Sequence, residues 1–270
     1  MVEKITFGDA DFKNLEVARQ IVLRRLKEDP TWCHMPVDAS EFDRYVNFPS
    51  NQNRERFLFL VREVIWDLLF QGVISPGENA PNPNLPWFHI TDYGREVVAA
   101  ERFVPHDPVG YIKEIRAVAK MCVSEVTFTY LEEALRCFTR GCHMASVLLL
   151  GVCAESVFLN LCNTISHSLK GAKEKKKFSD LNSVKSKHRW IISKFESLPR
   201  EAKREQLPES LDTTLGALYD LIRCQRNDLG HPQDSPPRVP RDLAFVFFRL
   251  FPTYVGDVET FANFCKVNGL

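Results

Sequence analysis

The sequence predicts a mainly α protein of two domains, with one small β-hairpin in the N-terminal domain. Apolar residues recur at helical spacing over most of the chain. A loop rich in Pro, Asn and Gly at 75–86 separates two short runs of the kind that forms paired strands. Two prolines and a glycine interrupt the helical pattern near the middle of the chain. We therefore expect domains at 1–103 and 111–270, joined by a linker at 104–110.

The N-terminal elements follow from apolar spacing and from residues that start or stop helices. Asp29-Pro30 ends the first helix, because the residue before a proline disfavours helical backbone. Gly72 suits the position just after the end of the second long helix, and Thr91 is a good N-cap for the helix after the hairpin. In chain order, the predicted elements are a helix at 14–27, a short middle helix at 38–44, a helix at 57–70, strands at 73–74 and 87–90, and a helix from 91.

The C-terminal domain is predicted to be helical throughout, apart from a charged loop. Residues 144–168 are apolar almost all round, which indicates a helix buried on most sides. The charged stretch 170–177 is predicted to be a loop. The other predicted helices cover 111–138, 185–198, 211–224 and 241–267.

Composition limits the class of protein. Apolar residues make up 44% and charged residues 26%, values typical of a soluble globular chain. The N-terminus lacks the apolar core of a signal peptide, and no uninterrupted apolar run approaches the ~18 residues of a membrane span. The eight cysteines form no Cys-x2-Cys pair, so we expect reduced core thiols in a cytoplasmic protein.

Motifs for other kinds of site are absent from the sequence. Neither Gly-x4-Gly-Lys-Ser/Thr nor Gly-x-Gly-x2-Gly is present, and Gly-x-Ser-x-Gly is also missing. No cluster of His, Cys and Asp has metal-ligand spacing. We therefore expect no cofactor and no metal, and any chemistry should be metal-independent. The net charge of zero gives no overall argument for nucleic acid.

The most informative segment is an apolar run that closes on Arg226-Asn227-x3-His231. His231 titrates near neutral pH and can move a proton, and Arg226 carries a permanent charge in a fork suited to phosphate. Asn227 can bond phosphate, ribose or a loop. Five helical residues turn by about 500°, which leaves Arg226 and His231 about 140° apart. They can share a face only if the backbone departs from helix at Gly230, so one catalytic face is better completed by another helix or by a second copy of the chain.

Each of these residues also has a structural alternative. His231 can bond a helix-terminal carbonyl, Arg226 can form an ion pair at a helix end, and Asn227 is a common turn residue. Glu155 lies among apolar residues of the 144–168 helix, where a carboxylate needs a partner. We expect Glu155 to be buried and paired with Arg226 or Arg223. The alternative for Glu155 is a structural salt bridge without chemistry.

A basic segment precedes the motif. Residues 170–205 hold twelve Lys or Arg against five Asp or Glu, an excess of seven, and they include Trp190 and His188. Cations beside an aromatic residue suit single-stranded nucleic acid, although a solvated charged loop has the same composition. The residues we expect to bind nucleic acid are Lys173, Lys175, Lys176, Lys177, Lys187 and Arg189.

The motif resembles the Arg-x4–6-His motif of the HEPN superfamily, and the resemblance continues in 137–155, which is similar to the apolar second helix of that family with its acidic residue. It covers the C-terminal 150–160 residues or so. The resemblance implies a HEPN-like helical bundle and a metal-independent endoribonuclease, in which the ribose 2′-OH attacks the adjacent phosphate. His231 would handle the proton, Arg226 would stabilise the phosphorane, and Asn227 and Glu155 would position them.

The family also implies partners and a biological setting. Its nucleases usually assemble the site across a two-fold dimer, so we expect a homodimer through the C-terminal helices. Family settings include toxin–antitoxin pairs and anti-phage defence, so RNA and an antitoxin or defence protein are the expected partners, and no membrane is expected.

The N-terminal order of helix, helix, hairpin and helix resembles a winged helix-turn-helix, on residues 66–74 and 88–94. In that fold, helix 57–70 would be the recognition helix. Its arginines Arg54, Arg56 and Arg62 are offset by nearby acidic residues, which is unusual for DNA reading. The alternative function is a transcriptional regulator: a non-catalytic HEPN dimerisation module with a DNA-binding winged helix. An interaction or regulatory wing is a further possibility.

Overall fold

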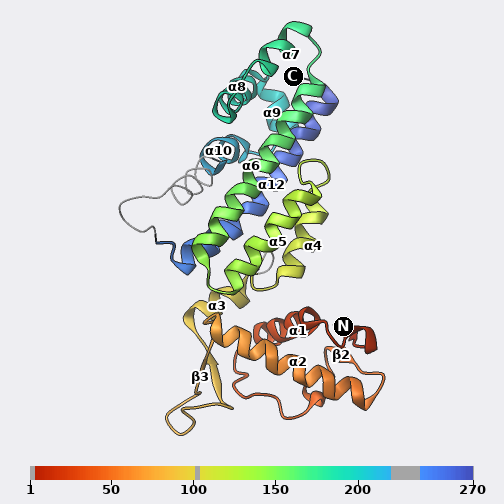
Figure 1. The fold of residues 1–270 in the computed structure, drawn as a ribbon, viewed down its shortest axis with the longest axis vertical. Helices are drawn as coiled ribbons and strands as arrows, with labels where there is room; N and C mark the ends of the chain where they lie inside the picture. The colour runs from red at the N-terminus through yellow and green to blue at the C-terminus, as the bar shows by residue number, and fades with distance from the viewer. Residues whose placement is uncertain (1–3, 101–103, 220–237, 270) are drawn as a thin grey trace. The chain divides into compact units, whose positions relative to one another are not determined.

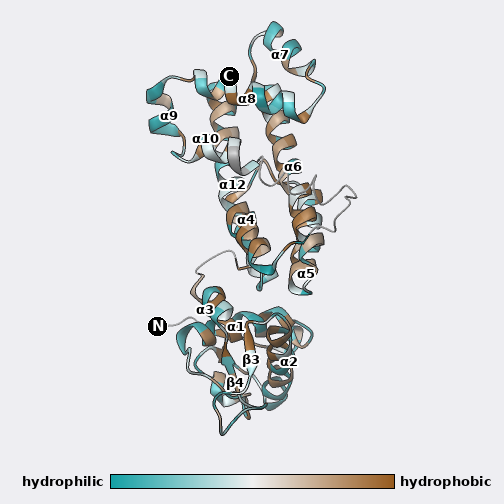
Figure 2. Cartoon of the chain, turned by 90° about the vertical axis from the view of Figure 1, so that its left-hand side faces the viewer, coloured by the Kyte–Doolittle hydropathy of each residue, from teal (hydrophilic) through white to brown (hydrophobic). Residues whose placement is uncertain are grey.

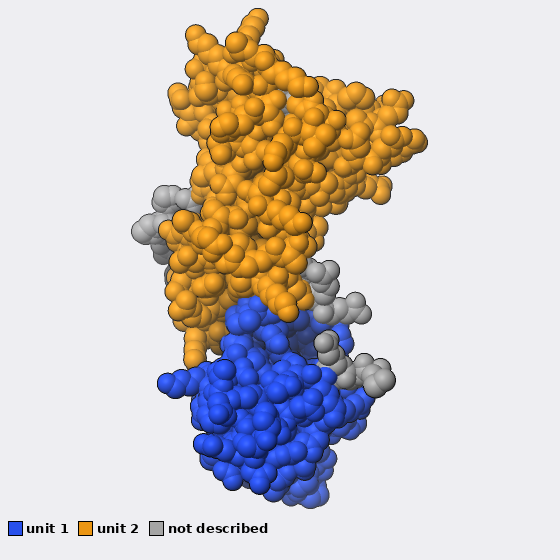
Figure 3. All heavy atoms as spheres, turned by 90° about the vertical axis from the view of Figure 1, so that its right-hand side faces the viewer, with its two compact units in different colours: residues 1–110 blue, residues 111–270 orange. Residues whose placement is uncertain are grey.

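The computed structural model describes residues 4–100, 104–219 and 238–269. The chain divides into two compact units, residues 1–110 and 111–270 (Figure 3). Most described residues are helical and the strands are short, so the predicted mainly α class is confirmed. Each unit is described by itself below.

Unit 1 (residues 1–110) is built on two helices that pack against each other (Figure 1). Helix α1 (Leu15–Glu28) and helix α2 (Asn51–Phe70) both turn apolar residues into a shared core. The ring of Phe57 lies at the centre of an aromatic cluster, 5.2 Å from Phe7 and 5.4 Å from Phe42 between ring centroids. Arg19 reaches from α1 to Asp67 on α2 with a 2.6 Å ion pair, which fixes the crossing of the two helices. The unit also contains β1 (Ile5–Thr6), η1 (Asp9–Asp11), η2 (Ala39–Phe42), β2 (Val46–Asn47) and α3 (Asp92–Ala99).

The predicted hairpin is present. Strand β3 (Ile74–Pro76) pairs antiparallel with β4 (Phe88–Ile90), and His34 forms a further β-bridge with Trp87 beside them. Thr91 caps α3 as predicted, since its hydroxyl accepts from the Gly94 amide at 2.9 Å. The predicted middle helix at 38–44 is a single 3-10 turn, η2, because the Asp38 carboxylate captures the Ser40 amide at its start.

Unit 2 (residues 111–270) is organised around two long helices. Helix α6 (His143–Ser168) spans 26 residues and packs against both α5 (Glu125–Thr139) and α12 (Arg241–Asn268), which spans 28. The Tyr254 hydroxyl of α12 donates to the Ala154 carbonyl of α6 at 3.0 Å. The shorter helices are α4 (Pro108–Val118), α7 (Ala172–Ser179), α8 (Val184–Ser197), α9 (Arg200–Gln206), α10 (Leu211–Thr213) and the π-helical turn η3 (Thr214–Leu218).

Helix α6 is long and apolar enough to cross a membrane by length and composition. Its apolar residues are mostly buried within unit 2, and Figure 2 shows hydrophobic residues along most of its length. Burial between α5 and α12 therefore accounts for the apolar composition that the sequence shows.

Three predictions for unit 2 and its boundary need correction. Residues 111–138 form two helices, α4 and α5, separated at 119–124, and α4 begins inside the expected linker at Pro108. The charged stretch 170–177 is largely helical, as α7. The helix expected at 211–224 is present over 211–219, as α10 followed by the π-helical η3, and its remainder lies outside the described residues.

A carboxylate on α12 explains the break between α4 and α5. Glu259 accepts hydrogen bonds from the amides of Met121 (2.8 and 3.0 Å) and Cys122 (2.9 Å), and the Asn160 amide donates to the Cys122 carbonyl at 3.0 Å. These bonds stabilise a non-helical bend where helical spacing alone predicts a continuous helix. The turn is thus held by α6 and α12 together.

The predicted core thiols are only partly found. Cys122, Cys153, Cys162 and Cys265 are buried, and burial raises the pKa of each thiol. Cys142 is exposed at the turn before α6, which is a correction, and Cys33 and Cys137 are half-buried. Cys224 lies outside the described residues. All seven described cysteines are free thiols, as expected.

We predict that Glu259→Ala destabilises unit 2 by about 2 kcal/mol, because two backbone amides lose a charged acceptor. For a unit of this size the melting temperature should fall by about 4–8 °C. Thermal unfolding followed by circular dichroism checks the effect. Glu132→Ala, at an exposed position of α5, is the matched control and should melt like the unchanged protein. Equal melting of both variants would contradict the role of Glu259.

Candidate functional site

The predicted catalytic residues Arg226, Asn227 and His231 lie outside the described residues. The structure does place the two ends of the segment that carries them. At the first end, the Tyr219 ring is buried against Phe158 of α6, with ring centroids 4.7 Å apart. Phe158 lies three residues after Glu155, so both side chains belong to neighbouring turns of α6. The chain therefore enters the motif segment beside the Glu155 region of α6.

The other end of the segment leads into α12 near the start of α6. Arg241, the first residue of α12, lies close enough to His143 at the first turn of α6 to affect its titration. Burial lowers the pKa of His143, and the positive charge of Arg241 lowers it further. Tyr219 thus contacts α6 at Phe158, and the charge of Arg241 acts on His143 at the first turn of α6.

Glu155 itself is half-buried, so the expectation of a buried carboxylate is wrong. The helical pattern placed Glu155 among apolar residues, but α5 and α12 do not fully cover that side of α6. Leu148 and Val152 are also half-buried, and Leu159 is 44% exposed. The expected partners of Glu155, Arg223 and Arg226, lie outside the described residues, so that pairing stays a prediction.

The polar side of α6 packs toward α5 and the turn before it. The Ser156 hydroxyl lies 2.7 Å from the Thr127 hydroxyl of α5, and Asn160 bonds the Cys122 carbonyl. These side chains have structural partners. Glu155 lies instead on the partly open side of α6.

The predicted nucleic-acid-binding residues divide into three groups. The four lysines of α7, which are Lys173, Lys175, Lys176 and Lys177, are all exposed. Helix α7 is anchored by Phe178, whose ring lies 4.7 Å from that of Trp190 on α8, and by the Glu174–Lys194 ion pair at 3.0 Å. Lys187 is half-buried with its ammonium 5.8 Å from the Phe178 ring centre, so it covers that contact. Arg189 is exposed on α8 and lines a groove apart from α7.

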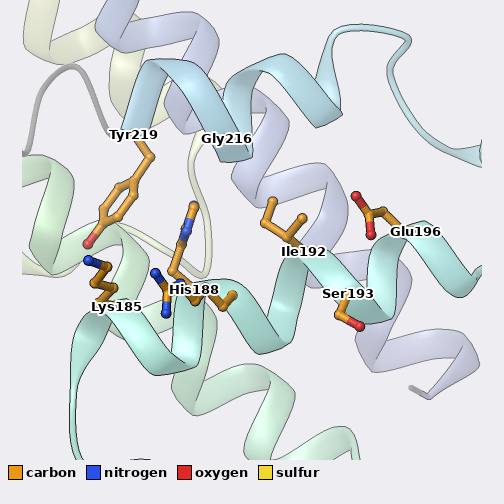
Figure 4. A pocket seen from close by; sticks show the side chains of 8 residues that line it. Lys185, His188, Ile192, Ser193, Glu196, Gly216 and Tyr219 are labelled. Atoms are coloured by element: carbon orange, nitrogen blue, oxygen red, sulfur yellow. The ribbon is translucent and has the colours of Figure 1, made fainter.

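This groove has a volume of about 450 Å³ and lies between α8 and η3 (Figure 4). We call it the α8–η3 groove. One of its walls contains His188, whose ring stacks on Tyr219 with 4.9 Å between ring centroids. The Nε2 of His188 donates to the Leu215 carbonyl in the π-helical turn. The lining residues are Lys185, His188, Arg189, Ile192, Ser193, Glu196, Gly216 and Tyr219.

Sequence reasoning missed Lys185, Ser193 and Gly216 as members of this groove. Lys185 and Arg189 are four residues apart, which places them on one helical face, and this spacing was a usable signal. Gly216 comes from a distant segment, and no local pattern connects it with α8.

Groups of three or more His, Cys, Asp or Glu that could hold a metal ion are not found within residues 4–100, 104–219 and 238–269. Comparisons of the chain with protein-family models, curated proteins and solved structures gave no match. The functional argument therefore depends on the residues and contacts of this chain.

We predict that Glu155→Gln has a modest effect on stability, about 1 kcal/mol or less. A half-buried carboxylate stays partly hydrated, so the loss of its charge disturbs the fold less than the loss of a buried one. Chemical denaturation with a fixed m-value measures the change. A loss of about 3–5 kcal/mol would show that Glu155 acts as a fully buried ion-pair partner.

Proposed function

We propose that the protein is a metal-independent endoribonuclease of the HEPN type. The observation that carries the proposal is the contact of Tyr219, the last described residue before the motif segment, with Phe158 of α6, three residues from Glu155. The motif segment therefore starts beside the turn of α6 that carries Glu155, which supports a shared role for Glu155, Arg226 and His231. A buried helix with a partly open acidic residue, next to an Arg-Asn-x3-His segment, suits phosphodiester chemistry.

The proposed reaction needs only the substrate and side chains of this chain. His231 takes the proton of a ribose 2′-OH, whose oxygen attacks the adjacent phosphorus. The bond from phosphorus to the 5′ oxygen breaks, and the proton held by His231 passes to that oxygen, leaving a 5′-OH and a 2′,3′-cyclic phosphate. Arg226 stabilises the charge that develops on the phosphorane oxygens. Asn227 and Glu155 position these two side chains.

The exposed α7 lysines and Arg189 support RNA binding. Four lysines on an eight-residue helix give a local positive surface on a chain with no net charge. Such a surface attracts a phosphate backbone over a distance of about 10 Å at moderate salt. A toxin or anti-phage effector, controlled by an antitoxin or another defence protein, is the proposed biological setting.

For unit 1 we propose a winged-helix-like domain that acts as an interaction or regulatory module. The order of α1, η2, α2, hairpin and α3 supports it. In such a fold α2 would be the helix available to DNA, but its exposed side carries Phe59 (55% exposed), Trp66 (48%) and Phe70 (85%).

The arginines of α2 also argue against DNA reading. Arg54 pairs with Asp43 at 2.8 Å, and Arg56 donates to the Phe12 carbonyl at 2.5 Å. The Arg62 guanidinium lies 5.9 Å from the centre of the Phe59 ring. All three already have partners within unit 1. The nuclease proposal is therefore favoured over the transcriptional regulator.

We predict that the protein is a homodimer through helices of unit 2. The angular separation of Arg226 and His231 on a helix favours another element to complete one catalytic face. A two-fold axis would form two such faces, one for each copy of the chain. Light scattering after size-exclusion chromatography at micromolar concentration should give twice the mass of the chain. A monomer under these conditions would contradict this part of the proposal.

We predict that Arg226→Ala and His231→Ala each reduce RNA cleavage by at least about 10²-fold, because each removes a group that acts on a charged transition state. A gel assay with a labelled single-stranded RNA measures the rate. Cleavage should persist in EDTA, and a 2′-deoxy sugar at the cut site should prevent it.

His167→Ala and Arg136→Ala are matched controls, since both positions are exposed in unit 2, and both variants should cleave at the unchanged rate. Cleavage of all-DNA substrates, or complete inhibition by EDTA, would contradict the mechanism. Tight binding to duplex DNA without any RNA cleavage would instead support the transcriptional regulator.

A further inference from the structure

The α8–η3 groove carries two cations on one side. Lys185 and Arg189 are both exposed and lie four residues apart on α8. Like charges at this spacing repel each other by a few tenths of a kcal/mol. Neither has an ion-pair partner in the part of the chain that the structure describes. A bound anion would relieve this repulsion.

Gly216 gives the groove open space on the opposite side (Figure 4). Apart from its chain neighbours and the backbone of its own turn, a Cβ atom at Gly216 would meet no heavy atom of the described residues within 4 Å, and its φ lies outside the left-handed region. Neither backbone strain nor crowding therefore requires glycine here, although glycine weakens a helical turn by about 1 kcal/mol relative to alanine. Glycine at such a position typically permits close approach of a ligand.

The wall between these two sides is rigid. The His188 ring is held by its bond to the Leu215 carbonyl and by stacking on Tyr219, and both rings are buried. The carbonyl belongs to a π-helical turn, a conformation that often marks functional sites. Because the side chains of this wall are already ordered, binding costs less conformational entropy of the protein.

The remaining lining residues fit the other parts of a nucleotide. Ile192 supplies apolar surface for a base, and the Ser193 hydroxyl can donate or accept a hydrogen bond. Glu196 lies two turns along α8 from Arg189. Its carboxylate repels phosphate and accepts hydrogen bonds from ribose hydroxyls or base amino groups. The groove is thus cationic at one end and acceptor-rich at the other.

We propose that the α8–η3 groove binds one nucleotide of a single-stranded RNA chain, with Lys185 and Arg189 on a backbone phosphate and the Gly216 side open for close approach of the strand. This inference rests on the proposed nuclease function. It adds a subsite that binds the RNA strand beside η3, just before the motif segment begins. Tyr219 then connects the two sites, because it lines the groove and contacts α6 next to Glu155.

The test measures the affinity of the full chain for a fluorescent 2′-O-methyl RNA oligonucleotide, which cannot be cleaved by 2′-OH attack. Fluorescence anisotropy gives Kd at several salt concentrations. In the Lys185→Gln, Arg189→Gln double variant we expect weaker binding, and the slope of log K against log salt should become shallower by about 0.7, the value for one phosphate of a single strand. Gly216→Leu should weaken binding by about fivefold or more, because it fills the groove without removing a charge.

The matched control is Lys113→Gln, Lys120→Gln, which removes two exposed cations from the same unit and should leave the slope unchanged. Melting temperatures of all variants check that each one folds. If the groove variants and the control lose affinity equally, or if none of them loses any, the groove proposal is overturned. AMP that binds as tightly as the oligonucleotide would also overturn it, since the site would then take a free nucleotide.

The outcomes separate this inference from the nuclease proposal. Groove-dependent binding by a protein that cleaves no RNA would support the groove and contradict the nuclease. RNA cleavage and binding that are both unaffected by Gly216→Leu and by the double variant would support the nuclease and overturn the groove.

Discussion

The burial of α6 is the constraint on which the arrangement of unit 2 depends. A helix of 26 residues that is apolar almost all round must be covered on most sides, since each fully buried large apolar side chain contributes about 1.5–3 kcal/mol. Helices α5 and α12 supply much of this cover. Hydrogen bonds from hydroxyl and amide groups join α6 to α5, to the turn before α5 and to α12. Leu148, Val152 and Glu155 mark the side that stays partly open. The proposed role of Glu155 depends on this partly open side of α6.

The same constraint positions the entrance to the proposed catalytic segment. Tyr219 follows η3 directly and packs on Phe158, while Asp257 of α12 accepts from the hydroxyls of Ser210 (2.8 Å) and Thr214 (2.6 Å). The start of the segment is therefore tied to α6 by an aromatic contact and to α12 by hydrogen bonds. The groove beside η3 shares these supports, because His188 bonds the Leu215 carbonyl. Binding and chemistry would then be held by one rigid framework.

Features with a strong local signal were predictable from the sequence. The apolar spacing of α6, the turn residues of the hairpin and the Thr91 cap each depend on neighbours in sequence, and the structure has all three. The break between α4 and α5 was not predictable, because Glu259, which bonds the Met121 amide, lies 138 residues away. Helix α7 was missed because its charged sequence has no apolar period and a single buried ring, Phe178, anchors it.

In the candidate site too, features set by neighbours in sequence were predictable, and features set by tertiary packing were not. A helical pattern identified Glu155 as unusual, but it could not show which side of α6 its neighbours leave open. The spacing of Lys185 and Arg189 was visible, whereas the approach of Gly216 depends on how η3 packs against α8. The roles proposed for Arg226, Asn227 and His231 come from the sequence motif, because these residues lie outside the described part of the chain.

The central claim is that Glu155 and Arg226 act on each other across the partly open side of α6. A double-mutant cycle with Glu155→Gln, Arg226→Gln and both together, measured as free energies of unfolding, tests it most directly. If the two residues interact, the effects should be non-additive by about 0.5–3 kcal/mol. Additivity within about 0.5 kcal/mol would mean that they are independent, and it would contradict the account.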